Sequence, residues 1–288
     1  MQKILICCLL MTLGLFTLTA APIDAAAKKD KALVVVSFGT TFPETREKDL
    51  EAVENALAQA FPDREFKRAF TAKIVMQRLL ENDGIKVDDL ETVLNNLAKE
   101  GYKDVLIQPT HLTYGEEYAK KIMTTVHNYK DKFAKLSVGR PLLADEKDYE
   151  LVAMALQTQI PQLANDEIVV FMGHGSPRQH NPAYNILEMN FKKFGIPAII
   201  GVVEEDDHPN FEDMLAQLKQ TKAKKVLLMP LMLVSGDHAN NDMAGEEEDS
   251  WLNLLKAEGY QVRYDLSGLG RNIAIQNIYV LHALSALS

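Results

Sequence analysis

The chain is poor in cysteine: its 288 residues include only two, Cys7 and Cys8, which are adjacent near the amino terminus. Residues 9–288 therefore contain no thiol, which excludes a disulfide in that part of the chain. A chain of this length can bury a hydrophobic core large enough to fold without such cross-links.

Both cysteines belong to a segment with the layout of a secretory signal peptide. Residues 1–27 place Lys3 before an apolar run at 4–18 and end in three alanines at 25–27, directly before Lys28. The apolar run is too short to be predicted as a membrane span. We therefore expect cleavage near Ala27, a periplasmic location, and no membrane span in the mature protein.

Positive charge is also scarce, because 40 acidic residues outnumber 31 basic ones and give a formal net charge of -9. The expected cleavage leaves that value unchanged, since residues 1–27 carry one lysine and one aspartate. An acidic protein does not fit the electrostatic pattern of nucleic-acid binding, so no nucleic-acid partner is predicted. The 47% hydrophobic and 25% charged residues are typical of a soluble globular protein.

Two common catalytic motifs are missing. Gly39-Thr40-Thr41 lacks the lysine and the glycine spacing of a phosphate-binding loop. The serine of Gly173-His174-Gly175-Ser176 lacks the flanking glycines of a nucleophile elbow. The sequence therefore gives little support to nucleotide-dependent or serine-hydrolase chemistry.

An internal repeat is the main pattern that is present. Residues 105–117 and 226–238 align without a gap, each as an apolar run that contains a proline and ends in a polar turn with a glycine. In this alignment Glu117 falls opposite His238. The apolar runs at 33–40 and 168–174 also resemble each other when small shifts are allowed, and they place Thr40 opposite His174. A repeat of roughly half the chain predicts two similar domains rather than a solenoid.

Apolar runs alternate with segments of helical periodicity through both halves, which favours parallel sheets with helical crossovers. We predict an α/β protein with two similar Rossmann-like domains that arose by internal duplication, with their strand ends meeting across one cleft. The predicted boundaries are a signal peptide at 1–27, an N-terminal domain at 28–144, and a C-terminal domain at 145–288 that ends in an amphipathic helix.

A ligand of an open α/β sheet lies outside the carboxyl ends of the strands. Three polar residues are expected at strand ends in the second half: His174, Glu204 and His238. Their counterparts in the first half are Thr40, Thr71 and Glu117. Two imidazoles and a carboxylate that converge predict an open site for a first-row divalent metal. Each residue alone also fits the simpler role of a turn residue or a hydrogen-bonded polar group.

The other histidines are assigned to roles outside the metal site. His111 ends an apolar strand and is expected in the cleft wall or the core. We expect His127, His180 and His208 to be solvated, and His282 to lie on the polar face of the terminal helix.

The ordered motifs resemble one known family, the anaerobic sirohydrochlorin cobaltochelatases of the CbiK type. The motifs include Ser-Phe-Gly-Thr at 37–40, Arg-Ala-Phe-Thr at 68–71, Phe-Met-Gly-His-Gly at 171–175, Gly-Val-Val-Glu at 201–204, and Ser-Gly-Asp-His-Ala-Asn-Asn-Asp-Met at 235–243. The resemblance extends from Lys31 to about Leu284.

The resemblance implies a class II chelatase, which needs no nucleotide and has a ferrochelatase-like fold of two α/β domains around a tetrapyrrole cleft. It implies that His174, Glu204 and His238 hold the incoming metal and that Glu117 acts with His174 in catalysis. The substrates implied are sirohydrochlorin and Co²⁺, with Fe²⁺ or Ni²⁺ as alternative metals and no tightly bound cofactor.

The predicted export departs from the family, most of which works in the cytoplasm. An exported protein derived from a chelatase could instead bind or carry a tetrapyrrole such as haem, or a metal. Retention of Glu117 together with the three predicted ligands favours the enzyme, because a carrier does not need both a proton relay and an open metal site. The sequence leaves a homo-oligomer open.

Overall fold

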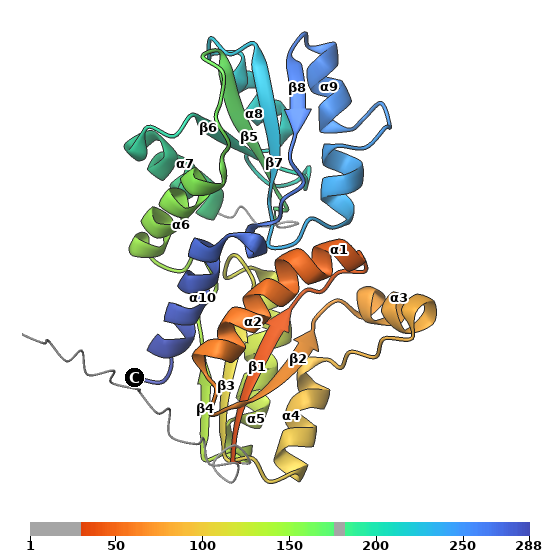
Figure 1. Ribbon diagram of the computed structural model, residues 1–288, viewed down its shortest axis with the longest axis vertical. Coiled ribbons are helices and arrows are strands. Elements are labelled where there is room, and N and C mark those ends of the chain that lie inside the picture. Colours follow the sequence, from red (N-terminus) through yellow and green to blue (C-terminus); the bar gives the residue numbers. More distant parts are fainter. Residues whose placement is uncertain (1–29, 176–181) are drawn as a thin grey trace, which may run out of the picture.

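The computed structural model describes residues 30–175 and 182–288, in which the chain forms two parallel four-stranded sheets (Figure 1). The first has the order β2-β1-β3-β4 and consists of β1 (Lys31–Ser37), β2 (Glu65–Phe70), β3 (Asp104–Pro109) and β4 (Lys135–Val138). The second has the order β6-β5-β7-β8 and consists of β5 (Glu167–Gly173), β6 (Ala198–Val202), β7 (Lys225–Leu231) and β8 (Gln261–Tyr264). The predicted α/β fold with parallel sheets is confirmed, and the identical strand order is what an internal duplication produces.

Helices cover both faces of each sheet. In the first half they are α1 (Pro43–Thr45), η2 (Arg46–Leu50), α2 (Glu51–Ala60), α3 (Lys73–Asp83), α4 (Leu90–Lys99), η3 (Tyr118–Met123), α5 (Thr124–Tyr129) and η4 (Lys130–Lys132). In the second half they are α6 (Glu146–Gln159), α7 (Ala183–Phe194), α8 (Phe211–Leu218), η5 (Ala239–Met243), α9 (Trp251–Ala257), η6 (Leu269–Arg271) and α10 (Ile273–Ser285). Of the short segments, η2, η3 and η5 are π-helical turns.

The central strands β1, β5 and β7 are mostly apolar because both faces of the sheet are buried there, whereas the edge strands β2 and β8 contain charged residues. In β1 the side chains alternate: Leu33 and Val35 face the core shared with the C-terminal domain, whereas Val34 and Val36 face the cluster under α4 and α5. The continuous apolar runs in the sequence are therefore the expected pattern for central strands of a covered sheet.

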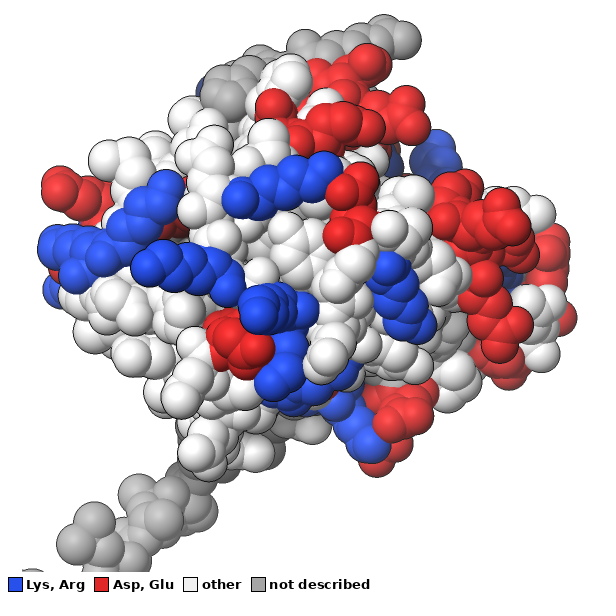
Figure 2. Space-filling model, turned by 90° about the horizontal axis from the view of Figure 1, so that it is seen from above, with Lys and Arg blue, Asp and Glu red and all other residues white. Residues whose placement is uncertain are grey.

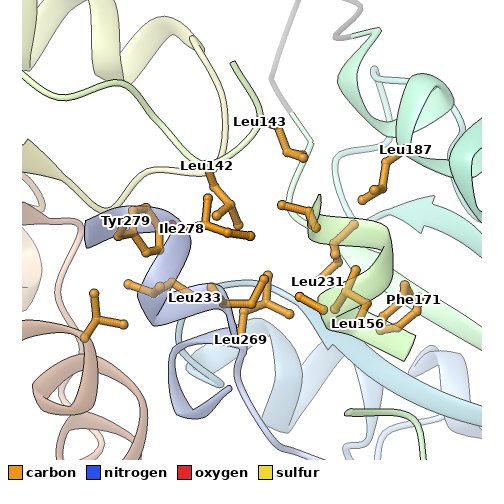
Figure 3. Close-up of a cluster of buried hydrophobic side chains, with 14 of the residues drawn as sticks. Leu142, Leu143, Leu156, Phe171, Leu187, Leu231, Leu233, Leu269, Ile278 and Tyr279 are labelled. Atoms are coloured by element: carbon orange, nitrogen blue, oxygen red, sulfur yellow. The ribbon is translucent and has the colours of Figure 1, made fainter. Parts of the chain in front are cut away.

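The largest core cluster crosses the junction between the two domains. It joins Leu33 of β1 to Leu142 and Leu143 of the connecting segment and to Phe171 of β5, all of which are buried. Figure 3 shows side chains from this segment, α6, β5, β7 and α10 pointing toward one another in one apolar layer. The two sheets are thus separate, but the hydrophobic core between them is continuous.

The last helix contributes to both domains. Figure 1 shows α10 running from the C-terminal domain back to the side of α2. Its Tyr279 hydroxyl donates a hydrogen bond to the carbonyl oxygen of Thr110 at 2.8 Å. The prediction that His282 lies on a polar face is wrong: its side chain is buried, with Nε2 2.9 Å from Oδ1 of Asp148. Because α10 packs against α2 of the first half and α6 of the second, this helix joins the two halves.

No helix among residues 30–175 and 182–288 combines the length and apolar character needed to cross a membrane. Figure 2 shows the end of the molecule formed by the C-terminal domain, where basic and acidic side chains are interspersed and the acidic ones gather toward one side. This face therefore does not form the continuous basic surface that binds a phosphate backbone.

Candidate metal and macrocycle site

A cleft of about 640 Å³ lies between the carboxyl ends of the strands of the two domains. This volume is within the roughly 300–1,000 Å³ range of ligand pockets. The predicted site residues on its walls are Thr40 and Glu117 from the N-terminal domain and His174, Glu204 and His238 from the C-terminal domain. The strand-end rule therefore located the cleft correctly from the sequence.

His174 directly follows β5 and is held by the residues on either side of it. The N–H of Gly175 donates to the Tyr184 hydroxyl at 3.1 Å, and Gly173 packs so closely on the Tyr184 ring that a Cβ would overlap it. Gly175 has φ +85, a conformation that favours glycine, and a Cβ there would also crowd Glu204. Burial raises the pKa of Tyr184 to about 12, so its hydroxyl stays neutral. These contacts give the His174 backbone little freedom.

His238 precedes the π-helical turn η5 and is oriented by a carboxylate one turn later. Its Nδ1 lies 2.6 Å from Oδ2 of Asp242. The carboxylate accepts the Nδ1 proton of a neutral imidazole, which leaves the Nε2 lone pair free for a metal. Asp242 was not among the predicted site residues, although its spacing of four residues from His238 on a helical segment could have indicated it.

The two imidazoles lie together in the cleft. The ring centroids of His174 and His238 are 4.8 Å apart, with an angle of 89° between the ring planes. Nδ1 of His174 lies 3.2 Å from the carbonyl oxygen of Gly175, which accepts its proton and leaves Nε2 of this ring free as well. Partial burial, together with neighbouring His238, holds the pKa of His174 below its usual range. Both rings can thus present an Nε2 lone pair to a metal ion.

Glu204 is the third predicted ligand, and it lies beside the histidine pair. Its Oε1 is 3.7 Å from Nδ1 of His174, and its backbone N–H donates to the His174 carbonyl oxygen at 3.1 Å. Within the described part of the chain, no three His, Cys, Asp or Glu side chains are grouped closely enough to hold a metal ion as they stand. The structure therefore brings the three predicted ligands into one cleft as a histidine pair with an adjacent carboxylate.

Glu117 occupies the equivalent position in the N-terminal domain. It precedes η3 just as His238 precedes η5, so the aligned residues introduce equivalent π-helical turns, a feature common at functional sites. The Lys121 ammonium donates to Glu117 at 2.9 Å. His111 lines the cleft nearby, and burial lowers its pKa to about 4. Its two ring nitrogens are buried and make no hydrogen bond within the described residues.

The position of His238 differs from the prediction in one respect. Strand β7 ends at Leu231, and residues 232–237 form a loop before His238, which was expected at the end of the strand itself. The end of the apolar run leaves the sheet after Leu231, and the loop that follows contacts the N-terminal domain through Ser235. Of the other counterparts, Thr40 and Thr71 are both buried, and the carbonyl of Thr71 accepts a hydrogen bond from Lys121.

The sequence of residues 31–288 matches the family model described as cobalt chelatase (CbiK). The chain belongs to this family of cobalt chelatases. It is 42% identical over 258 residues to the sirohydrochlorin cobaltochelatase of Salmonella typhimurium, covering 90% of this chain and 97% of that protein. It is 30% identical over 260 residues to the sirohydrochlorin cobaltochelatase CbiKC of Nitratidesulfovibrio vulgaris, covering 90% and 91%.

Solved structures share the fold of this cobalt chelatase. SirB from Bacillus subtilis with Fe³⁺ has a TM-score of 0.60 at 15% identity, covering 89% of this chain and 95% of that chain. The sirohydrochlorin chelatase SirB from Bacillus subtilis subspecies spizizenii in complex with cobalt has a TM-score of 0.56 at 13% identity, with the same coverage. The predicted family and the class II chelatase fold are therefore confirmed, and the protein is an enzyme with cobalt as its substrate metal.

Proposed function

We propose that this chelatase inserts Co²⁺ into sirohydrochlorin without ATP, as a step in cobalamin biosynthesis. The observation that carries the proposal is the pair of imidazoles, His174 and His238, with Glu117 on the opposite wall of one cleft. The two relatives named sirohydrochlorin cobaltochelatase cover nearly the whole chain and support this choice of substrate.

The walls of the cleft suit a flat macrocycle that carries carboxylates. Phe38 and Ile74 line the cleft, and both have about half of their surface exposed, which leaves apolar area for the face of a tetrapyrrole. Three cations also line it: Arg78, Lys120 and Lys121. The acetate and propionate side chains of sirohydrochlorin can pair with such cations.

The reaction exchanges one Co²⁺ for the two pyrrole N–H protons of the macrocycle. His174 and His238 replace water on the ion with nitrogen ligands, and the nearby Glu204 carboxylate neutralises part of its charge. Glu117 accepts the two pyrrole protons in turn from the other wall and passes each of them to solvent. Because imidazole and carboxylate also bind Fe²⁺ and Ni²⁺, we expect these ions to be alternative substrates.

An absorbance assay tests the proposed function. We expect the purified chain to convert sirohydrochlorin and Co²⁺ to cobalt-sirohydrochlorin without nucleotide and faster than the same mixture without protein. Stoichiometric haem binding without any acceleration would contradict the proposal and support the alternative, an exported tetrapyrrole-binding protein.

Cobalt affinity should depend on pH through the proton that competes for Nε2 of His174. Partial burial and neighbouring His238 lower the pKa of His174, so the neutral ligand persists below the ordinary histidine value of about 6.5. We expect the Kd for Co²⁺ to stay constant from neutral pH down to that value and to rise at lower pH. Isothermal titrations across this range measure the effect, and a loss of affinity that begins above neutral pH would contradict it.

We also propose that residues 1–27 are a signal peptide and that the mature enzyme is periplasmic. These residues lie outside the described part of the chain, and the family match begins shortly after them, at residue 31. Expression of the full chain followed by cell fractionation should recover protein that starts near Lys28 in the periplasmic fraction. Intact protein with Met1 in the cytoplasm would contradict the prediction.

A further inference from the structure

The loop at residues 232–237, which leads from β7 to His238, is bound to the N-terminal domain through the backbone of Ser235. The Ser235 N–H donates to Oδ2 of Asp49 at 3.2 Å, and its carbonyl oxygen accepts from the Thr45 hydroxyl at 3.0 Å. Thr45 and Asp49 are buried residues of α1 and η2. Both polar groups of one peptide residue, three positions before His238, are therefore fixed by the opposite domain.

Arg271 holds the same carboxylate from the other side. Its Nε donates to Oδ1 of Asp49 at 2.5 Å, and the Asp49 side chain is 0% exposed. The segment that carries Arg271 packs directly on Asp49, because a Cβ at Gly268 would overlap the carboxylate and a Cβ at Gly270 would overlap the Asp49 backbone. We call Thr45, Asp49 and Arg271 around the Ser235 backbone the Ser235 clamp.

The clamp lies directly behind the cleft wall. Val234, Gly236 and His238 line the cleft on either side of the clamped residue. The loop is also tied to η6, since the N–H groups of Leu269 and Gly270 donate to the carbonyls of residues 232 and 233 at 2.9 Å. A shift of the Ser235 backbone would therefore move the cleft wall and His238 with it.

We propose that the Ser235 clamp positions His238 against the N-terminal wall of the cleft, with Asp49 as its central positioning residue. The inference rests on the proposed function, in which the C-terminal domain holds the metal and the N-terminal domain supplies Glu117 and much of the macrocycle surface. The clamp then determines the position of the metal relative to the macrocycle, although it contacts neither of them. Asp49 and Thr45 should affect the turnover step more than the binding of either substrate.

Two substitutions test the clamp. Asp49→Asn keeps the size of the side chain but removes the charge that pairs with Arg271, and Thr45→Val removes only the hydroxyl that binds Ser235. We expect kcat for Co²⁺ insertion to fall about 10- to 100-fold in Asp49→Asn and about 3- to 10-fold in Thr45→Val, because small misplacements of reacting groups are costly. The KM for sirohydrochlorin and the Kd for Co²⁺ should stay within about threefold of wild type.

Asp148→Asn is the matched control. Asp148 is also a buried aspartate at the domain junction, paired with an arginine, Arg140, at 2.9 Å, but it does not contact the loop at 232–237. Melting temperatures measured for all three variants show how much each one weakens the fold. We expect Asp148→Asn to retain wild-type kcat even where its melting temperature falls as far as that of Asp49→Asn.

The possible outcomes distinguish a failure of the clamp proposal from a failure of the proposed function. An equal fall of kcat in Asp49→Asn and Asp148→Asn, unchanged kcat in both clamp variants, or a loss of Co²⁺ affinity that matches the loss of kcat would overturn the positioning role. If Asp49→Asn does not fold, the kcat of Thr45→Val decides in the same way. A wild-type chain that does not insert Co²⁺ would overturn the proposed function itself, and the role of the clamp with it.

Discussion

Replacing His174 with alanine is expected to abolish Co²⁺ insertion while the protein remains folded. The side chain is 45% exposed, so its loss leaves no large cavity, but it removes one of two imidazoles that meet in the cleft. Loss of an outer partner of a metal ligand typically costs about 10- to 100-fold in metal affinity or activity, and loss of a ligand itself should cost at least about 100-fold. His238→Ala should have the same effect.

The matched control is His127→Ala, which removes an exposed histidine from α5, outside the cleft. We expect this variant to keep wild-type activity and cobalt affinity, measured by the absorbance assay and by Co²⁺ titration. Full insertion activity in a His174→Ala, His238→Ala double variant would show that cobalt reaches the macrocycle by another route.

Glu117→Gln is expected to slow insertion by about 100-fold or more, because a positioned general acid or base typically contributes 10²–10⁴-fold to a rate. The amide keeps the size of the side chain and can still contact Lys121, which lies 2.9 Å from the carboxylate in the wild type. It cannot accept a pyrrole proton. Since Glu117 belongs to the domain opposite the histidine pair, the Kd for Co²⁺ should change by less than about threefold.

Glu116→Gln separates proton transfer from the general charge of the cleft. Glu116 is the neighbouring carboxylate, also lines the cleft, and forms an ion pair with Lys120. Single-turnover rates should stay near wild type in Glu116→Gln and fall in Glu117→Gln. Equal slowing of both variants would mean that Glu117 acts through charge alone and is not the proton acceptor.

The sequence was sufficient to predict the fold because each central strand is covered on both faces. Buried parallel strands such as β1 and β5 give continuous apolar runs, and the gapless match between the runs of β3 and β7 predicted that the two halves share one topology. The position of His282 was not predictable in this way, because its burial depends on Asp148, a residue 134 positions earlier.

The sequence predicted only those residues of the site that lie close to the ends of strands. His174 directly follows β5 and Glu204 lies two residues after the end of β6, so the rule for parallel sheets placed them on one edge. The groups that orient the site were missed for different reasons. Asp242 is a local partner that helical spacing could have indicated, whereas Asp49 is 186 residues from Ser235, a contact that no local pattern encodes.

The return of α10 to the N-terminal domain fixes the order in which the protein can complete its fold. The first domain is synthesised early, but the helix that packs against α2 and binds the Thr110 carbonyl spans residues Ile273–Ser285, close to the end of the chain. Part of the first domain therefore stays uncovered in a nascent chain until α10 has been synthesised, and that apolar surface is available to a chaperone in the meantime.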